Sequence, residues 1–120
     1  MTAASRRSAE RRGRGAETLA ALFLGAKGYR PLARRYRTPA GEIDLVVRRG
    51  KRIAFVEVKE RRTPHDAAWA VTPRQQARIV RAAEGWLARN APRGDFEIGF
   101  DVVLISPRRW PRHIVDAFRA

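Results

Sequence analysis

The chain contains no cysteine, so disulfide bonds, cysteine-ligated zinc and thiol catalysis are excluded. No apolar run reaches the length that would span a membrane. Acidic residues are also scarce: 12 aspartates and glutamates accompany 26 lysines and arginines, which gives a formal net charge of +14. Such an excess on a small chain favours a polyanionic partner, with nucleic acid first and an anionic membrane surface second. Most of the cationic residues are arginines, whose planar guanidinium groups suit phosphate.

The length of 120 residues, of which 44% are hydrophobic, fits one domain with a real core. Residues 1–13 are rich in arginine and lack apolar periodicity, so they predict a disordered basic N-terminal arm before a single domain at 14–120. The arginines that precede the apolar residues 19–26 superficially resemble a secretory signal, but this stretch is short, amphipathic and preceded by Glu17. We therefore expect a cytoplasmic protein with no membrane partner.

Residues 41–47 and 53–59 are the most informative stretch because they predict a β-hairpin. Both runs are rich in β-branched and aromatic residues, and the turn between them is too short for any other connection. A type II′ turn with Gly50 and Lys51 at its centre is the favoured geometry. A turn one residue earlier would keep the same side chains on one face, whereas a three-residue loop would split them unless a bulge restored the alternation.

On the two-residue turn, Asp44 lies directly opposite Glu57, and Lys59 lies on the same face of the hairpin. Two carboxylates placed in this way repel each other unless a cation lies between them. A divalent metal ion bound by both is one explanation, and oxygen ligands favour Mg²⁺ or Mn²⁺. The alternative is a solvated hairpin face whose carboxylates pair with some of the many arginines.

The segments around the hairpin predict an α/β fold. A helical period at residues 14–27 precedes a strand at 31–37, which would complete an antiparallel meander with the hairpin. After a loop at 60–70 and a second helix, the strand at 96–105 should run parallel to the second hairpin strand. Residues 114–118 predict a last short strand or a helical turn. The expected architecture is a central mixed sheet flanked by helices.

Two polar side chains on the predicted helices are further candidates for the site. Glu17 lies at the border of the apolar stripe of the first helix, where it either leans toward the sheet or only complements the helix dipole. Gln76 continues the apolar stripe that Val80, Ala83 and Leu87 form on the second helix. A buried glutamine needs hydrogen-bond partners, so Gln76 either orients a water, a phosphate or a carboxylate, or is a satisfied structural amide.

The second helix has a clear start and a basic outer face. Thr72 and Gln75 form a capping box around Pro73. Arginines recur at helical spacing on the face opposite the apolar stripe, without the mixture of signs that is usual on a solvated face. The residues expected to contact nucleic acid are Arg34, Arg35, Arg37, Arg61, Arg62, Arg74, Arg78 and Arg81.

The order αβββαβ, with Asp on the second strand and Glu-x-Lys on the third, resembles the restriction-endonuclease-like core of the PD-(D/E)xK nuclease superfamily. Within it, four blocks look like the YraN-like uncharacterised family (family 0102), and the similarity extends from about residue 15 to residue 118. The blocks are Gly41-Glu42-Ile43-Asp44-Leu45, Phe55-Val56-Glu57-Val58-Lys59, the helix start at Val71-Thr72 with Gln76, and Phe100-Asp101-Val102-Val103.

The resemblance implies a metal site and a set of catalytic residues. Asp44 and Glu57, together with the carbonyl of Val58, would bind Mg²⁺ or Mn²⁺. Lys59 would position or activate the attacking water, and Glu17 would be the accessory acid of the first helix. Gln76 belongs to the same motif set, and the chain departs from the family pattern at Gln75, where a lysine is expected.

These observations predict a metal-dependent endonuclease that hydrolyses phosphodiester bonds of DNA, with branched or repair-intermediate structures as candidate substrates. The alternative is a non-catalytic nucleic-acid-binding module that retains the nuclease fold. The intact set of Asp44, Glu57 and Lys59 favours the enzyme, because an adjacent pair of acids would only repel phosphate in a pure binding protein. Binding to a membrane surface is disfavoured, because the apolar stripe of the first helix is needed to cover the sheet.

Overall fold

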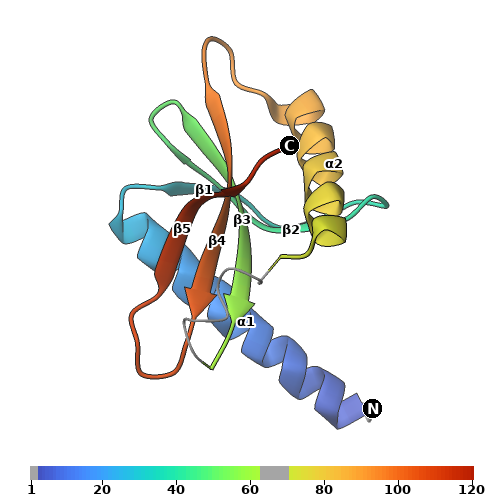
Figure 1. Cartoon of the computed structure of the whole chain (residues 1–120), viewed down its shortest axis with the longest axis vertical. Coiled ribbons are helices and arrows are strands. Elements are labelled where there is room, and N and C mark those ends of the chain that lie inside the picture. Colours follow the sequence, from blue (N-terminus) through green and yellow to red (C-terminus); the bar gives the residue numbers. More distant parts are fainter. Residues whose placement is uncertain (1–2, 63–70) are drawn as a thin grey trace.

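The computed structural model describes the backbone of residues 3–62 and 71–120, and the side chains of residues 15–62 and 71–120. Figure 1 shows a central sheet with one helix on each side. The elements are α1 (Ala3–Ala26), β1 (Arg30–Arg37), β2 (Glu42–Arg49), β3 (Arg52–Glu60), α2 (Pro73–Asn90), β4 (Glu97–Ile105) and β5 (Arg112–Phe118). The predicted αβββαβ order is confirmed, and the last segment is a strand. Most of the predicted loop at 60–70 lies outside the described residues.

The five strands lie side by side in sequence order, β1-β2-β3-β4-β5. Neighbouring strands are antiparallel except for β3 and β4, which run parallel because α2 carries the chain back across the sheet. The mixed sheet predicted from the sequence, a meander plus a parallel strand, is therefore confirmed. Within residues 3–62 and 71–120, no helix has the length and apolar character needed to cross a membrane.

The alternation of side chains along β3 divides the core into two layers. Ile53 and Phe55 pack with α2 on one face of the sheet. Ala54 and Val56 pack with α1 on the other face. Because the alternation continues toward the end of β3, the side chains of Glu57 and Lys59 belong to the α2 face.

The hairpin between β2 and β3 has the predicted register. Leu45 pairs with Val56 and Val46 with Phe55, as the two-residue turn requires. Gly50 has a φ of 59°, and it is the one central residue of this turn with a positive φ, as a type II′ turn requires. The register therefore places Asp44 and Glu57 at opposing positions.

The helices differ from the sequence-based prediction in their bounds and their buried faces. Helix α1 begins at Ala3, so residues 3–13 continue the helix and are not the predicted disordered arm. The alanine, arginine and glutamate residues of this segment are good helix formers, and this local preference outweighs the lack of an apolar pattern. In α2 the residues that lie deepest include Ile79 and Trp86, whereas Val80 and Leu87 are only half-buried.

The large ring of Trp86 explains this rotation of α2. It packs edge-to-face against Phe55, with the ring centroids 5.8 Å apart. Burying an indole contributes more than burying a valine or a leucine, so the helix turns the Trp86 side toward the sheet. Ala83 is buried as predicted, but the centre of the buried face lies a part of a turn away from Val80 and Leu87, with consequences for Gln76.

Candidate active site

The candidate site lies where the pairing between β2 and β3 ends and the two strands diverge. The paired residues of the two strands end at Leu45 and Val56, and the next backbone N–H of β3 on that side, at Val58, donates to Asp44 Oδ2 (2.8 Å). The side chain of Asp44 thus replaces the backbone acceptor that the diverging strand no longer supplies. Glu57 is the nearest acidic neighbour of Asp44, and each carboxyl group affects the pKa of the other.

Both carboxyl groups have raised pKa values because both are largely removed from water. Burial raises the pKa of Glu57 to about 8, and the charge of Asp44 adds to this shift. Burial also raises the pKa of Asp44, although the hydrogen bond from the Val58 N–H opposes the shift. At neutral pH the pair therefore carries a proton that a bound cation would displace.

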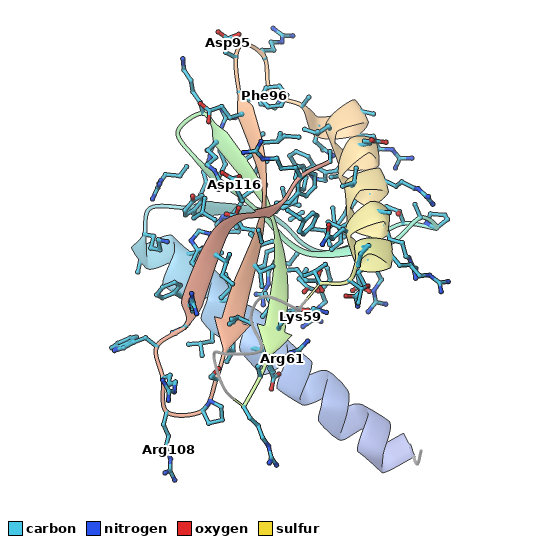
Figure 2. The ribbon with its side chains drawn as sticks, in the orientation of Figure 1. Lys59, Arg61, Asp95, Phe96, Arg108 and Asp116 are labelled. Carbon is cyan, nitrogen blue, oxygen red and sulfur yellow. The ribbon has the colours of Figure 1, made fainter. Side chains whose placement is uncertain are left out.

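Lys59 supplies positive charge at the edge of this pair. Its Nζ lies 3.5 Å from Glu57 Oε1, and the side chains of the two residues are 17% and 16% exposed. The ammonium opposes the upward shift of the Glu57 pKa without cancelling it. Figure 2 shows Lys59 toward the end of β3, beside the segment that carries Arg61. The predicted juxtaposition of Asp44, Glu57 and Lys59 is present in the structure.

A cleft of about 230 Å³ opens onto Glu57 beneath the first turns of α2. Its other lining residues are Glu42, Gln75, Arg78 and Ile79. The helix approaches the strand closely here, because Gly41 has no side chain: a Cβ on Gly41 would lie 2.8 Å from the carbonyl oxygen of Arg78. Arg78 Nε also donates to the carbonyl of Ala40 (3.2 Å), which fixes the helix against the turn before β2.

The donor set fits a hard divalent cation. Among residues 15–62 and 71–120, there is no group of three or more His, Cys, Asp or Glu side chains placed to hold a metal ion. Mg²⁺ does not need such a group, because it commonly keeps several waters and binds one or two carboxylates. The neighbouring carboxyl groups of Asp44 and Glu57, with the carbonyl of Val58 beside them in the chain, are the set that could hold it.

Glu17 leans toward the sheet. Since α1 begins at Ala3, Glu17 is not in the first turn of the helix, and complementing the helix dipole does not explain its position. Its Oε2 accepts a hydrogen bond from Arg35 Nε (2.6 Å), and its side chain is only 13% exposed. Glu17 is close enough to raise the pKa of Asp44 through its charge. Arg35, which has a φ of 49°, holds it in place.

Gln76 is not at the candidate site. Its Nε2 donates to the carbonyl of Val71 (3.1 Å), and its side chain lines a separate groove with Arg119 at the other side of the helix start. This placement does not support the alternative in which Gln76 orients a water, a phosphate or a carboxylate. It agrees with the other alternative, a structural amide whose hydrogen bond is satisfied. The rotation of α2 causes the difference, because it brings Gln75 instead into the cleft with Glu57.

Gln75 has a structural contact as well as this place in the cleft. The predicted capping box is present: Thr72 Oγ1 accepts from the N–H of Gln75 (3.2 Å), and Gln75 Oε1 accepts from the N–H of Thr72 (3.1 Å). A lysine at this position would have no acceptor for the second of these bonds. Gln75 thus stabilises the start of the helix, but it lacks the positive charge of the lysine that the family pattern predicts at this position.

The arginines on α2 form one surface with the turn before β2. Arg74, Arg78 and Arg81 line a groove of about 300 Å³ with Pro39 and Ala40. Arg78 belongs both to this groove and to the cleft at Glu57. Arg37 extends the surface along the turn, although its Nε also donates to Glu42 (3.3 Å). This row of arginines therefore leads into the candidate site.

The other predicted arginines lie elsewhere. Arg34 Nη2 donates to Thr18 Oγ1 of α1 (3.0 Å), and Arg35 pairs with Glu17. Arg61 and Arg62 line a second cleft at the end of β3. The eight arginines thus form three groups rather than one continuous surface.

A buried ion-pair network surrounds Asp101 and was not predicted from the sequence. Asp101 is fully buried and accepts two hydrogen bonds from Arg52 (2.8 and 2.7 Å), one from His113 (2.7 Å) and one from the N–H of Asp116 (2.9 Å). Burial raises the pKa of Asp101, but these bonds, with Arg52 foremost, outweigh it and hold the pKa well below its usual range. The signal in the sequence was a charged residue inside an otherwise apolar strand. Asp101 pairs with Val56, so the network lies on the α1 face and ties β3, β4 and β5 together.

The fold and this site define a class of protein: an α/β protein with the αβββαβ core order of restriction-endonuclease-like proteins, in which a half-buried carboxylate pair and a lysine lie on the central hairpin. The chain belongs to the family described as "Uncharacterised protein family UPF0102", which it matches over residues 16–105. The resemblance drawn from the sequence motifs is thereby confirmed at the level of the family.

Similar proteins come from several bacteria. A UPF0102 protein of Bradyrhizobium diazoefficiens is 59% identical over 113 residues, which cover 94% of this chain and 85% of that protein. One of Parvibaculum lavamentivorans is 59% identical over 112 residues, or 93% and 84% of the two chains. One of Nitrobacter winogradskyi is 57% identical over 108 residues, or 90% and 92%. These names assign no reaction to the family.

Proposed function

We propose that this protein is a Mg²⁺- or Mn²⁺-dependent endonuclease that hydrolyses phosphodiester bonds of DNA. The observation that carries the proposal is the neighbouring pair of Asp44 and Glu57, largely buried beside Lys59, with Glu57 open to a cleft that Arg78 borders. Two adjacent acids with raised pKa values are costly in a folded protein and are typical of functional sites. The cytoplasmic location predicted from the sequence remains part of this proposal.

The residues around the cleft have distinct parts in this chemistry. Mg²⁺, when bound by Asp44, Glu57 and the carbonyl of Val58, would act as the Lewis acid for attack of water on phosphorus. Lys59 would donate hydrogen bonds to a phosphate oxygen as negative charge develops there, since its ammonium already lies 3.5 Å from Glu57. Glu17, held by Arg35, would add negative charge near Asp44 and so strengthen the attraction of the site for a cation.

The arginine surface on α2 fits the backbone of a nucleic acid. Arg74, Arg78 and Arg81 are exposed, carry no carboxylate partner among the described ion pairs, and follow one groove toward the cleft. Contacts of this kind position a nucleic acid without selecting a sequence. The proposal therefore includes substrates recognised by structure, such as branched or repair-intermediate DNA, rather than by sequence.

A non-catalytic nucleic-acid-binding module is the second candidate. The observation in its favour is that both acids already have partners without a metal ion: Asp44 accepts from the Val58 N–H, and Glu57 lies 3.5 Å from Lys59 Nζ. Such a protein would use the same arginine surface, but it would bind DNA equally well with and without a divalent cation.

The two candidates are distinguished by a cleavage assay on a panel of linear, forked and branched DNA with Mg²⁺, Mn²⁺ or chelator. Lys59→Ala should abolish metal-dependent cleavage and leave the DNA affinity nearly unchanged, because binding loses one positive charge of many. Lys51→Ala is the matched control, since Lys51 is an exposed lysine at the opposite end of β3, and it should cleave at the wild-type rate. Equal rates for Lys59→Ala and Lys51→Ala in a preparation free of other nucleases would contradict the role of Lys59.

A further inference from the structure

The loop between β4 and β5 presents a tryptophan to solvent. Trp110 is 88% exposed, the highest value among the large hydrophobic side chains in the described part of the chain. Trp86, by contrast, is buried in the core. Trp110 belongs to none of the described core clusters, and an exposed indole provides a large contact area at little cost in conformational entropy.

The surroundings of Trp110 are strongly basic. Arg108, Arg109 and Arg112 flank it, all three are exposed, and no acidic residue occurs between Ile105 and Arg112. Figure 2 shows Arg108 projecting from the tip of the loop, away from the sheet. Pro107 and Pro111 restrict the backbone on both sides of this segment, which lowers the entropy lost when a ligand binds.

The loop lies at the same end of the sheet as the candidate active site. Strands β3 and β4 are parallel and end at one edge, where Lys59 pairs with Leu104 and Glu60 with Ile105. The N–H of Arg61 donates to the carbonyl of Ile105 (2.9 Å), which fixes the two strand ends against each other. The loop that carries Trp110 therefore begins within two residues of the partner of Lys59.

A cleft of about 380 Å³ lies between the ends of the two strands. Glu60, Arg61 and Arg62 at the end of β3 form one wall, and Ile105, Ser106 and Pro107 at the start of the loop form the other. A strand of nucleic acid bound in this cleft would contact Arg61 and Arg62 on one wall and the first residues of the Trp110 loop on the other.

We propose that this loop is a second nucleic-acid contact, in which Trp110 stacks on an unpaired base of DNA while Arg108 and Arg109 contact the adjoining phosphates. The proposal rests on the nucleic-acid-binding part of the proposed function and adds the kind of substrate: DNA with a single-stranded stretch next to the cleavage site. The bases of a continuous duplex already stack on their neighbours, so only unpaired bases offer a ring face to the indole. Alternating aromatic and cationic side chains are the usual composition of single-strand binding surfaces.

The test compares DNA binding by wild type and Trp110→Ala in chelator, so that no cleavage occurs. The probes are a fluorescent single strand and the corresponding duplex, measured by anisotropy at several salt concentrations. Trp110→Ala should weaken single-strand binding by about tenfold and leave duplex binding unchanged, because one stacked base is lost. The dependence of affinity on salt should stay the same, since the phosphate contacts remain. Trp110→Phe should retain most of the affinity.

Leu22→Ala is the matched control, because Leu22 is a 68% exposed apolar residue on α1 and its removal should change neither affinity. Equal losses on single strand and duplex, or no loss on either, would overturn the proposal. Loss of binding to anionic phospholipid vesicles with unchanged DNA binding would overturn it in favour of a membrane contact, for which an exposed Trp with arginines is also suited.

The outcomes for this proposal and for the nuclease are separable. Selective loss of single-strand affinity in Trp110→Ala, with no metal-dependent cleavage by the wild type, would support the loop contact and contradict the nuclease. Cleavage of forked DNA by the wild type, with Trp110→Ala indistinguishable in both binding and rate, would support the nuclease and contradict the loop contact.

Discussion

At the scale of single residues, the unusual feature is a pair of acids that keeps a proton at neutral pH. Asp44 and Glu57 face each other across the hairpin, and burial is the largest cause of the raised pKa of each. Lys59 reduces the repulsion but lies on one side only, at 3.5 Å from Glu57. A protein that needed only stability would replace one of these acids, because a buried carboxyl costs more than a neutral side chain of the same shape.

The raised pKa of Glu57 predicts how stability depends on pH in the metal-free protein. Its folded pKa of about 8 lies above the usual 4.5, so the native state binds an extra proton between these values. The contribution of this group to stability is fully present below about pH 4.5 and is lost as the pH rises through 8. In chelator, Glu57→Gln should therefore match wild type near pH 5 and exceed it near pH 8, by about 2–4 kcal/mol.

Urea unfolding at several pH values measures this difference. Glu84→Gln is the control for the chemical change itself, because Glu84 is an exposed acid on α2 outside the candidate site. If Glu57→Gln were less stable than wild type at pH 8, Glu57 would be a structural ion-pair partner of Lys59. Its burial would then not lower the stability of the folded protein.

At the scale of elements, the contact between α2 and the turn before β2 shapes the cleft. Gly41 lies against the backbone of Arg78, and the side chain of Arg78 bonds back to Ala40. This contact holds the first turns of α2 over Glu57 and places the arginine row beside it. The helix start is also fixed by the capping box of Thr72 and Gln75.

Gly41→Ala should therefore destabilise the protein by about 1–3 kcal/mol, because the added Cβ meets backbone atoms of Arg78 that cannot move alone. Gly85 lies on α2 and has open space where a Cβ would be. Gly85→Ala should therefore raise stability by up to about 1 kcal/mol. Denaturant unfolding of both variants measures the two effects. Wild-type stability of Gly41→Ala would show that the close approach of α2 is not required.

Much at this scale could be predicted from the sequence, because it depends on local chemistry. The turn at Gly50, the hairpin register and the capping box each follow from a few adjacent residues. The rotation of α2 could not be predicted from the spacing of apolar residues, because it depends on how Trp86 meets Phe55 across the sheet. The same rotation decides that Gln75, and not Gln76, faces the cleft.

At the scale of the whole molecule, two polar sites divide the sheet between them. Glu57 borders the cleft beneath α2 with Asp44 and Lys59 beside it, whereas the network around Asp101 lies on the α1 face and joins three strands. The network satisfies its charges internally, and the Asp44–Glu57 pair does so only by keeping a proton. The spacing of residues along one hairpin reveals the Asp44–Glu57 pair in the sequence. The network around Asp101 leaves no such pattern, because its partners are far apart in the chain.

The proposed nuclease chemistry depends most on the binding of a divalent cation by Asp44 and Glu57. Thermal unfolding of the intact protein tests this without a known substrate, by comparing wild type and Glu57→Gln in chelator and in rising Mg²⁺ or Mn²⁺. A metal bound by the native state should raise wild-type stability by about 1.4 kcal/mol at tenfold excess over Kd, a shift of a few degrees in Tm. Glu57→Gln should show no such shift. Equal shifts in both proteins, or none in wild type, would contradict the claim and remove the chemical basis of the nuclease.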